Sequence, residues 1–178
     1  MCALYLSMQN PSCTLSPVRL VCEIGTVKQL DLSWNPLEVN CGLTIAENLK
    51  NYSKLTSFKA AGIKVDTREL MAMLSALKDC TGLQHLDLAE HDMKYDAKMG
   101  QLLSDIITSC PLLSLNVGYN DLSGITKSLT SAIGQCKTLM DLDVSSVKIG
   151  PKIKDLLDAL DGRTNFVKFA VGFNKFPS

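Results

Sequence analysis

Apolar residues recur along this chain in one spacing, Leu-x-x-Leu-x-Leu-x-x-Asn-x-Leu, where x is any residue. The clearest copies are VKQLDLSWNPL from Val27, LQHLDLAEHDM from Leu83, LLSLNVGYNDL from Leu112, LMDLDVSSVKI from Leu139 and FVKFAVGFNKF from Phe166. Weaker copies begin at Leu55 (LTSFKAAGIKV) and, weakest of all, at Met1 (MCALYLSMQNP). Successive copies start 26, 28, 28, 29, 27 and 27 residues apart, which indicates a chain built from tandem repeats.

The Leu-x-Leu core of each copy predicts a short β-strand, because alternate side chains of a strand point to opposite faces. The two apolar residues then face the interior and the middle residue faces solvent. The expected inward pairs are Leu30/Leu32, Phe58/Ala60, Leu86/Leu88, Leu115/Val117, Leu142/Val144 and Phe169/Val171.

The asparagine of the spacing marks the point where the chain turns away from the strand. Its side-chain amide is expected to bond the backbone groups that the turn leaves open. Asn35, Asn120 and Asn174 hold this place, whereas Ile63, His91 and Val147 replace it. We predict a structural role for His91, with a ring nitrogen bonded to the backbone.

About 16 residues follow each strand, and most of these segments have apolar residues at helical spacing. One helix per repeat is therefore predicted. The spacing is clearest in Leu70/Leu74/Leu77, Leu102/Leu103/Ile106/Ile107, Leu129/Ile133 and Ile153/Leu156/Leu157/Leu160.

Repeats of about 20–29 residues with this consensus are the signature of leucine-rich repeats, and a strand plus a full helix resembles the ribonuclease-inhibitor-like type. The sequence predicts an α/β leucine-rich-repeat solenoid (a horseshoe) of about six to seven repeats of about 28 residues. Parallel strands should line its concave face and helices its convex face. We expect residues 1–178 to form a single such domain, in which the first repeat, 1–26, is weak.

The last copy of the spacing ends close to Ser178, with no polar helix after it. Solenoids generally need a polar cap at each end. This predicts a fragment or an uncapped array, with self-association through the uncapped ends as one outcome.

Charge and cysteine content argue against several function classes. Basic and acidic residues number 18 each, which argues against nucleic-acid binding. No apolar run approaches the length of a membrane span, so we expect no direct membrane insertion. The seven cysteines form no disulfide framework and no signal peptide precedes them, which predicts reduced thiols in a cytoplasmic protein. Cys80, Cys110 and Cys136 lie at nearly the same place in their repeats, as small apolar fillers would.

Motifs for catalysis or cofactor binding are missing from the sequence. It contains no clustered metal ligands, no G-x-S-x-G elbow, no P-loop and no G-x-G-x-x-G. We therefore expect no enzyme activity, no catalytic residue, no cofactor and no metal.

The exposed positions of the predicted strands point to protein binding. Their middle residues should form one row across the concave face, since neighbouring strands lie about 4.8 Å apart. Three of them are aspartates, and aromatic residues precede the turn in three repeats, along one rim. Aromatic anchors and steering charges are typical of protein interfaces, although an acidic row can also be ordinary solvated surface. The candidate contact residues are Asp31, Trp34, Lys59, His85, Asp87, Asn116, Tyr119, Asp141, Asp143 and Phe173.

From about Gly82 to Lys175, the stretches LQHLDLAEHDMK, SCPLLSLNVGYNDL, SAIGQCKTLMDLDVSS and TNFVKFAVGFNK resemble the repeats of the CARMIL family. These proteins are large cytoplasmic scaffolds that link actin capping protein, the plasma membrane and myosin I. The resemblance implies a piece of an actin-cytoskeleton scaffold. The family's capping-protein-binding tail and lipid-binding domain have no counterpart here, and none of its functional residues maps onto these positions.

The favoured function is a non-catalytic protein–protein interaction module or scaffold with a protein partner on its concave face. One alternative is a GTPase-activating regulator of the Ran GTPase-activating type, which supplies a loop arginine. The arginines here are Arg19, Arg68 and Arg163, and none lies in a recognisable motif. Another alternative is a structural component of a large assembly that covers the ends and the helical face.

Overall fold

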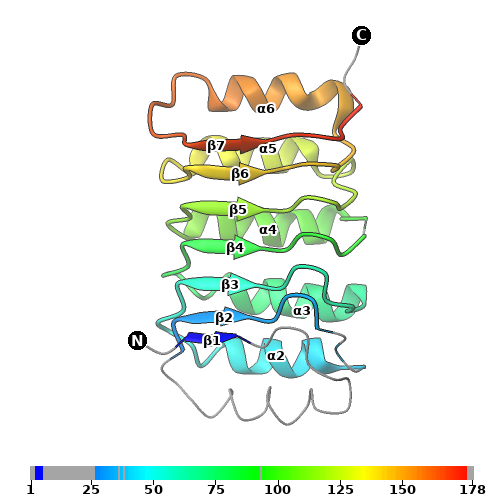
Figure 1. The fold of residues 1–178 in the computed structure, drawn as a ribbon, viewed down its shortest axis with the longest axis vertical. Helices are drawn as coiled ribbons and strands as arrows, with labels where there is room; N and C mark the ends of the chain where they lie inside the picture. Colours follow the sequence, from blue (N-terminus) through cyan, green and yellow to red (C-terminus); the bar gives the residue numbers. More distant parts are fainter. Residues whose placement is uncertain (1–2, 6–26, 36, 38, 93, 176–178) are drawn as a thin grey trace.

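Seven short parallel strands form one sheet in chain order, as the repeats predict (Figure 1). The computed structural model describes residues 3–5, 27–35, 37, 39–92 and 94–175. Each copy of the spacing contributes one strand, including the weakest copy at Met1, although residues 6–26 of that repeat lie outside the described part. The strands are β1 (Ala3–Tyr5), β2 (Gln29–Asp31), β3 (Ser57–Lys59), β4 (His85–Asp87), β5 (Ser114–Asn116), β6 (Asp141–Asp143) and β7 (Lys168–Ala170).

The helices form a second layer that covers one face of this sheet (Figure 1). They are α2 (Cys41–Leu49), α3 (Thr67–Leu77), α4 (Ala97–Ser109), α5 (Thr126–Gln135) and α6 (Ile153–Leu160), the last preceded by a 3-10 turn, η2 (Gly150–Lys152). This alternation of strand and helix confirms the predicted α/β solenoid. Within the described residues, no helix has the length and apolarity needed to cross a bilayer.

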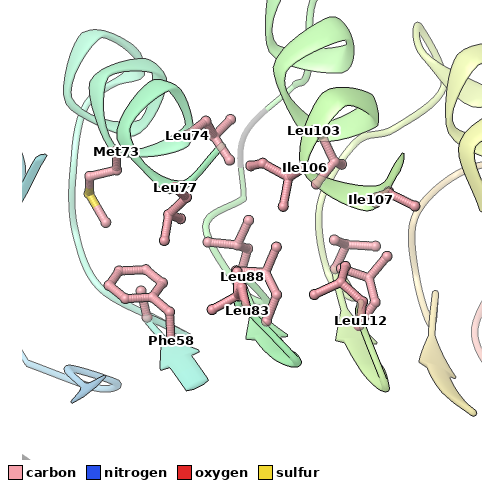
Figure 2. Close-up of a cluster of buried hydrophobic side chains, with 14 of the residues drawn as sticks. Phe58, Met73, Leu74, Leu77, Leu83, Leu88, Leu103, Ile106, Ile107 and Leu112 are labelled. Atoms are coloured by element: carbon pink, nitrogen blue, oxygen red, sulfur yellow. The ribbon is translucent and has the colours of Figure 1, made fainter. Parts of the chain in front are cut away.

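The core lies between the two layers. Figure 2 shows Phe58, Leu83, Leu88 and Leu112 on the sheet side, facing Met73, Leu74 and Leu77 of α3 and Leu103, Ile106 and Ile107 of α4. All ten side chains are 0% exposed, and burying each one stabilises the fold by about 1.5–3 kcal/mol. The predicted inward pairs are buried from β2 to β6, whereas Phe169 and Val171 of the edge strand β7 are half-buried.

Two leucines counted in the helical spacing lie away from the core. Leu102 is half-buried and Leu157 is 48% exposed, whereas their neighbours Leu103 and Leu156 are buried. Because consecutive helical residues point about 100° apart, Leu102 and Leu157 lie further from the centre of the buried helix face than Leu103 and Leu156 do. The apolar spacing of these two segments, which predicts the helices correctly, therefore includes two leucines, Leu102 and Leu157, that lie outside the fully buried face.

Side-chain amides hold the turns after β2, β5 and β7, where Asn35, Asn120 and Asn174 stand. Asn120 donates from Nδ2 to the carbonyl of Val117 in its own repeat (3.1 Å) and to that of Leu88 in the preceding repeat (2.8 Å). Its Oδ1 accepts the backbone N–H of His91 (3.2 Å). Asn174 makes the same set of bonds two repeats further along the chain. The predicted role of the turn asparagine is confirmed.

His91 takes the place of the asparagine in its repeat. Its Nε2 donates to the carbonyl of Ala60 in the preceding repeat, at 2.7 Å. This bond corresponds to the one that Asn120 makes, and it confirms the predicted structural role. Burial lowers the pKa of His91 below its usual value, and Nδ1 has no hydrogen-bond partner in the described residues. The folded state therefore holds the ring neutral.

The substitution His91→Asn should remove an acid-sensitive component of stability. A histidine whose folded pKa is lowered contributes stability that is present above its unfolded pKa, about 6.5, and is lost as the pH falls below that value. The loss is at most about 1.4 kcal/mol per pH unit. Urea unfolding of the parent should therefore show a steeper decrease in unfolding free energy between neutral and mildly acidic pH than His91→Asn shows.

A matched control is His85→Asn, which removes a histidine from the sheet surface and leaves His91 in place. It should keep the parent's loss of stability on acidification. Identical pH profiles for the parent and His91→Asn would show that the neutral state of His91 does not contribute to stability.

Candidate functional site

The strand register places the middle residues of the strands in one row across the concave face. The row reads Tyr5, Asp31, Lys59, Asp87, Asn116, Asp143 and Ala170, each paired with the next at its Cα atom. Asp31, Asp87, Asn116 and Asp143 are half-buried, and Lys59 is exposed. The structure therefore brings together the row that the spacing predicts.

The acidic members of this row have a backbone role that the sequence analysis missed. Oδ1 of Asp87 accepts the N–H of Ala89, two residues further on, at 3.1 Å. Asp31, Asn116 and Asp143 accept the corresponding N–H at 3.0, 3.1 and 2.9 Å. A short polar side chain at this place satisfies an amide where the strand ends. A preference for Asp or Asn in the middle of Leu-x-Leu was the available signal.

Lys59 cannot accept this bond, and the structure compensates from the neighbouring repeat. The N–H of Ala61 donates to Oγ of Ser33 instead, at 3.2 Å. This backbone bond uses only Oδ1 of Asp31, Asp87 and Asp143. The row therefore serves the fold and carries charge at the same time.

Asp87 is the row member with a perturbed acidity. Burial raises the pKa of Asp87, and the hydrogen bonds from the Ala89 amide and the Asn116 side chain lower it, as does the positive charge of Lys59. The net shift is upward. Ionised Asp87 is therefore less stable in the folded chain than in water, despite three favourable partners.

A second polar row lies one position earlier in each strand. The register pairs Ala3, Gln29, Ser57, His85, Ser114, Asp141 and Lys168 in sequence. Nδ1 of His85 is 3.1 Å from Oγ of Ser114. Of these residues, only His85 and Asp141 are among the candidate contacts predicted from the sequence. Gln29, Ser57, Ser114 and Lys168 are their neighbours in the row, and the strand periodicity is the signal that identifies them.

The two rows enclose a shallow hollow at the N-terminal half of the concave face. It has a volume of about 270 Å³. Its lining is polar except for one leucine and comprises Gln29, Leu30, Asp31, Ser57, Lys59, His85 and Ser114. A hollow of this size and polarity fits a side chain of a partner better than a separate apolar ligand.

The rim residues share an unusual backbone conformation. The residue before the turn has a positive φ in all six described repeats: Trp34 (62°), Gly62 (65°), Glu90 (60°), Tyr119 (57°), Ser146 (54°) and Phe173 (58°). Glycine adopts this region freely, whereas a bulky L-residue is strained by about 1–2 kcal/mol. The turn requires a positive φ at this position, whereas the side chain varies from the hydrogen of glycine to the indole of tryptophan.

The three rim aromatics lie in two separate groups. The ring of Trp34 covers Gly62, where a Cβ would lie 2.4 Å from the indole Cε3 atom. Tyr119 and Phe173 lie on either side of the Ser146 repeat, with ring centroids 6.5 Å apart. Trp34, Tyr119 and Phe173 are 49%, 44% and 83% exposed. The rim is interrupted by Gly62 and Glu90, so the predicted aromatic edge is not continuous.

The buried thiols and the C-terminal arginine are committed to the fold. Cys41, Cys80, Cys110 and Cys136 are buried and form no disulfide with one another, and burial is the main cause that raises the pKa of Cys80 and Cys110 to about 11. A thiol with such a pKa is protonated at neutral pH and is a poor nucleophile. The described residues contain no group of three or more His, Cys, Asp or Glu placed to hold a metal ion.

Arg163 caps the C-terminal end of α5. Its guanidinium donates to the carbonyls of Ile133, Gly134 (3.0 Å) and Cys136 (2.8 Å). Carbonyls at a helix end lack partners inside the helix, and a cation satisfies them while opposing the helix dipole. Arg68 is exposed and donates to Oδ1 of Asn40 at 3.2 Å, and Arg19 lies outside the described residues.

Comparison with known proteins supports the fold. No protein-family model matches this sequence, and no curated protein matches it. Among solved structures, the chain is similar to an internalin from Listeria monocytogenes, which is a leucine-rich-repeat protein, with a TM-score of 0.57 and 18% sequence identity. The similarity covers 89% of this chain and 45% of the internalin chain. The chain therefore has a leucine-rich-repeat fold and spans less than half the length of that structure.

The substitution Asp87→Asn should leave stability unchanged or increased at neutral pH. The amide oxygen can still accept the Ala89 N–H, and the disfavoured charge is removed. Because a carboxyl with a raised folded pKa stabilises the fold below its unfolded pKa and loses that contribution as the pH rises through the folded pKa, any advantage of the variant should shrink below about pH 4. Chemical unfolding at the two pH values measures this difference.

Asp87→Ala should instead lower the unfolding free energy by about 1 kcal/mol, because it leaves the buried Ala89 amide without its acceptor. Asn116→Ala is the matched control, since the same bond is lost one repeat later, and it should cost a similar amount. A fully stable Asp87→Ala would show that the side-chain acceptor is dispensable there.

Proposed function

We propose that this chain is a non-catalytic protein-interaction module whose concave face and rim hold a partner protein. The observation that carries the proposal is the pair of rim aromatics Tyr119 and Phe173. Both occupy a backbone conformation that strains a bulky residue, and both present much of their surface to solvent. Gly62 occupies the same place in another repeat, so the turn itself does not need a ring. Strain kept at exposed aromatic positions supports a role in binding.

The charge of the concave face favours a partner with a basic surface. Asp141 and Asp143 lie on the same face of β6, on either side of the buried Leu142, and a Cβ on Gly118 of the Tyr119 repeat would lie 3.3 Å from Oδ1 of Asp143. Aspartates outnumber the lysines in the two rows, Lys59 and Lys168. Carboxylates beside exposed rings suit the side chains of arginine and lysine, which pair with the former and stack on the latter.

The type of partner, the cellular compartment and a GTPase-activating role are further proposals, which the identity of the partner would test. The resemblance to CARMIL repeats proposes a partner from the actin machinery. Free, buried cysteines with raised pKa values fit a reducing, cytoplasmic setting. A GTPase-activating role would need an available arginine, and the engagement of Arg163 with α5 leaves Arg68 as the only accessible one in the described part. We therefore favour binding without catalysis.

The test is affinity capture from cell extract with the parent chain, with the double variant Tyr119→Gly/Phe173→Gly, and with the triple variant Asp31→Asn/Asp87→Asn/Asp143→Asn. Glycine relieves the backbone strain and asparagine keeps the backbone hydrogen bond, so both variants should unfold within about 1 kcal/mol of the parent. We expect at least about a ten-fold loss of the captured protein for each variant.

Ser146→Gly and Lys127→Glu are the matched controls. The first makes the same backbone change between the two rings, and the second places a charge change on α5, in the helical layer. Both should capture the partner like the parent. Undiminished capture by both concave variants would assign the acidic row and the rim to ordinary solvated surface.

A second candidate role, assembly through the C-terminal edge, is favoured by one observation. Val167, just before the edge strand β7, is 73% exposed, and Phe166 and Phe169 beside it are half-buried with rings 6.3 Å apart. An apolar strand edge favours pairing with another chain.

Sedimentation velocity over a wide concentration range tests this role. The parent should associate at high concentration, and Val167→Lys should remain monomeric, since a charge on an edge strand opposes pairing. Lys127→Glu should associate like the parent. A parent that stays monomeric throughout would remove self-association through this edge.

A further inference from the structure

The helical layer contains an apolar groove between α3 and α4, on the side of the sheet opposite to the concave surface. Its volume is about 580 Å³. Its floor is formed by the half-buried side chains of Met71, Ala72 and Leu102. The remaining lining residues are exposed and comprise Thr67, Arg68, Ser75 and Lys98. Leu102 is one of the two leucines whose exposure departs from the helical spacing.

The groove exists because the neighbouring helix pairs are drawn together by glycines and this pair is not. A Cβ on Gly42 of α2 would lie 2.6 Å from Cβ of Glu69 in α3. A Cβ on Gly100 of α4 would lie 2.5 Å from Cγ2 of Ile125, at the start of α5. Such distances leave no room for any side chain, so these glycines permit close packing.

The α3–α4 seam has no comparable contact. α3 contains no glycine, and the one glycine of α4, Gly100, faces α5. A Cβ on Gly134 of α5 would lie 3.6 Å from Cβ of Ala159 in α6, which is an ordinary van der Waals contact. Met71 and Leu102 therefore lie between two helices that no glycine brings into close contact, and apolar surface is left between α3 and α4.

The charged residues that line the groove are both basic. Arg68 and Lys98 are the second residues of α3 and α4, so they lie at the same end of the groove. Lys98 makes no ion pair within the described residues. Asp66 and Asp96 also lie at this end, but they cap the helices, accepting the N–H groups of Glu69 (2.8 Å) and Met99 (2.9 Å). The groove itself therefore presents cations beside an apolar floor.

We propose that the α3–α4 groove binds an amphipathic helix of a partner protein that carries acidic residues beside its apolar stripe. A helix fits because the groove runs between two helices. The 11 residues of α3 span about 16 Å, which matches anchors at positions i, i+3 or i+4, and i+7 of a docked helix. Acidic residues near one end of that helix pair with Arg68 and Lys98. This surface is separate from the concave face, and the proposal does not depend on binding there.

The test uses three synthetic amphipathic helices of about four turns with one shared framework. The first has leucines at the anchor spacing and glutamates beside them, the second has lysines in place of the glutamates, and the third has serines in place of the leucines. Binding is measured by fluorescence anisotropy, and the site is located by amide shifts in the 15N spectrum. We expect the acidic leucine peptide to bind at least about ten-fold more tightly than the other two. The shifted amides should belong to α3 and α4.

Two variants of the full chain separate charge from shape. Arg68→Glu/Lys98→Glu should reverse the preference so that the lysine peptide binds more tightly, and Ser75→Trp should weaken both by filling the groove. The matched controls on α5, Lys127→Glu and Ser131→Trp, should bind like the parent. Unchanged circular dichroism and unfolding midpoints establish that each variant is folded.

Three results would overturn the proposal. The first is the absence of measurable binding of the acidic peptide to the folded parent, or equal binding of the acidic and lysine peptides. The second is a set of shifts on the strands, which would move the site to the concave face. The third is a concentration-dependent dimer of the parent that Arg68→Glu/Lys98→Glu abolishes, which would make a second copy of this chain the occupant.

Discussion

Within the described residues, no strand has a hydrogen-bonding partner strand inside its own repeat. Each strand is three residues long, and its bonds run to the adjacent repeats, on both sides for β2 to β6 and on one side for β1 and β7. The bonds continue beyond the strand, for example from the N–H of Leu32 to the carbonyl of Lys59 (2.8 Å) and from that of Leu88 to Asn116 (2.9 Å). Every repeat must therefore advance along the solenoid axis by the same distance as its neighbours. The inward pairs of apolar residues, the amide ladder and the helical layer all follow this common spacing.

The same constraint determines what the exposed positions can do. Asp or Asn in the middle of β2, β4, β5 and β6 accepts a bond from the strand end, and residues before the turn adopt a positive φ whatever side chain they carry. Asp87 and Asn116 show two side chains that meet the first requirement, while Gly62 and Tyr119 show two that meet the second. Variation in the binding surface is therefore limited to side chains compatible with a fixed backbone.

Much of this fold could be predicted from the sequence because each element depends on a local pattern that is repeated. The strands, the inward pairs and the bonds of Asn120 and His91 follow from the spacing alone. The helix faces were predicted less well, since Leu102 and Leu157 have the same hydrophobicity as their buried neighbours. The α3–α4 groove and the cap that Arg163 provides depend on which residues of adjacent helices meet, and no pattern within one repeat contains that information.

The filler cysteines have a consequence for how the chain opens. Cys80, Cys110 and Cys136 lie in three successive repeats, each at most 5% exposed, and Sγ of Cys110 lies 3.4 Å from the carbonyl of Cys80 in the repeat before it. A thiol reagent can reach one of them only after its repeat has separated from the adjacent one. The labelling rate of each thiol therefore measures how often the solenoid unfolds locally at that repeat. An adduct too large for the closed interior would keep that repeat separated from its neighbour. A cysteine oxidised to such an adduct therefore identifies a repeat that has opened.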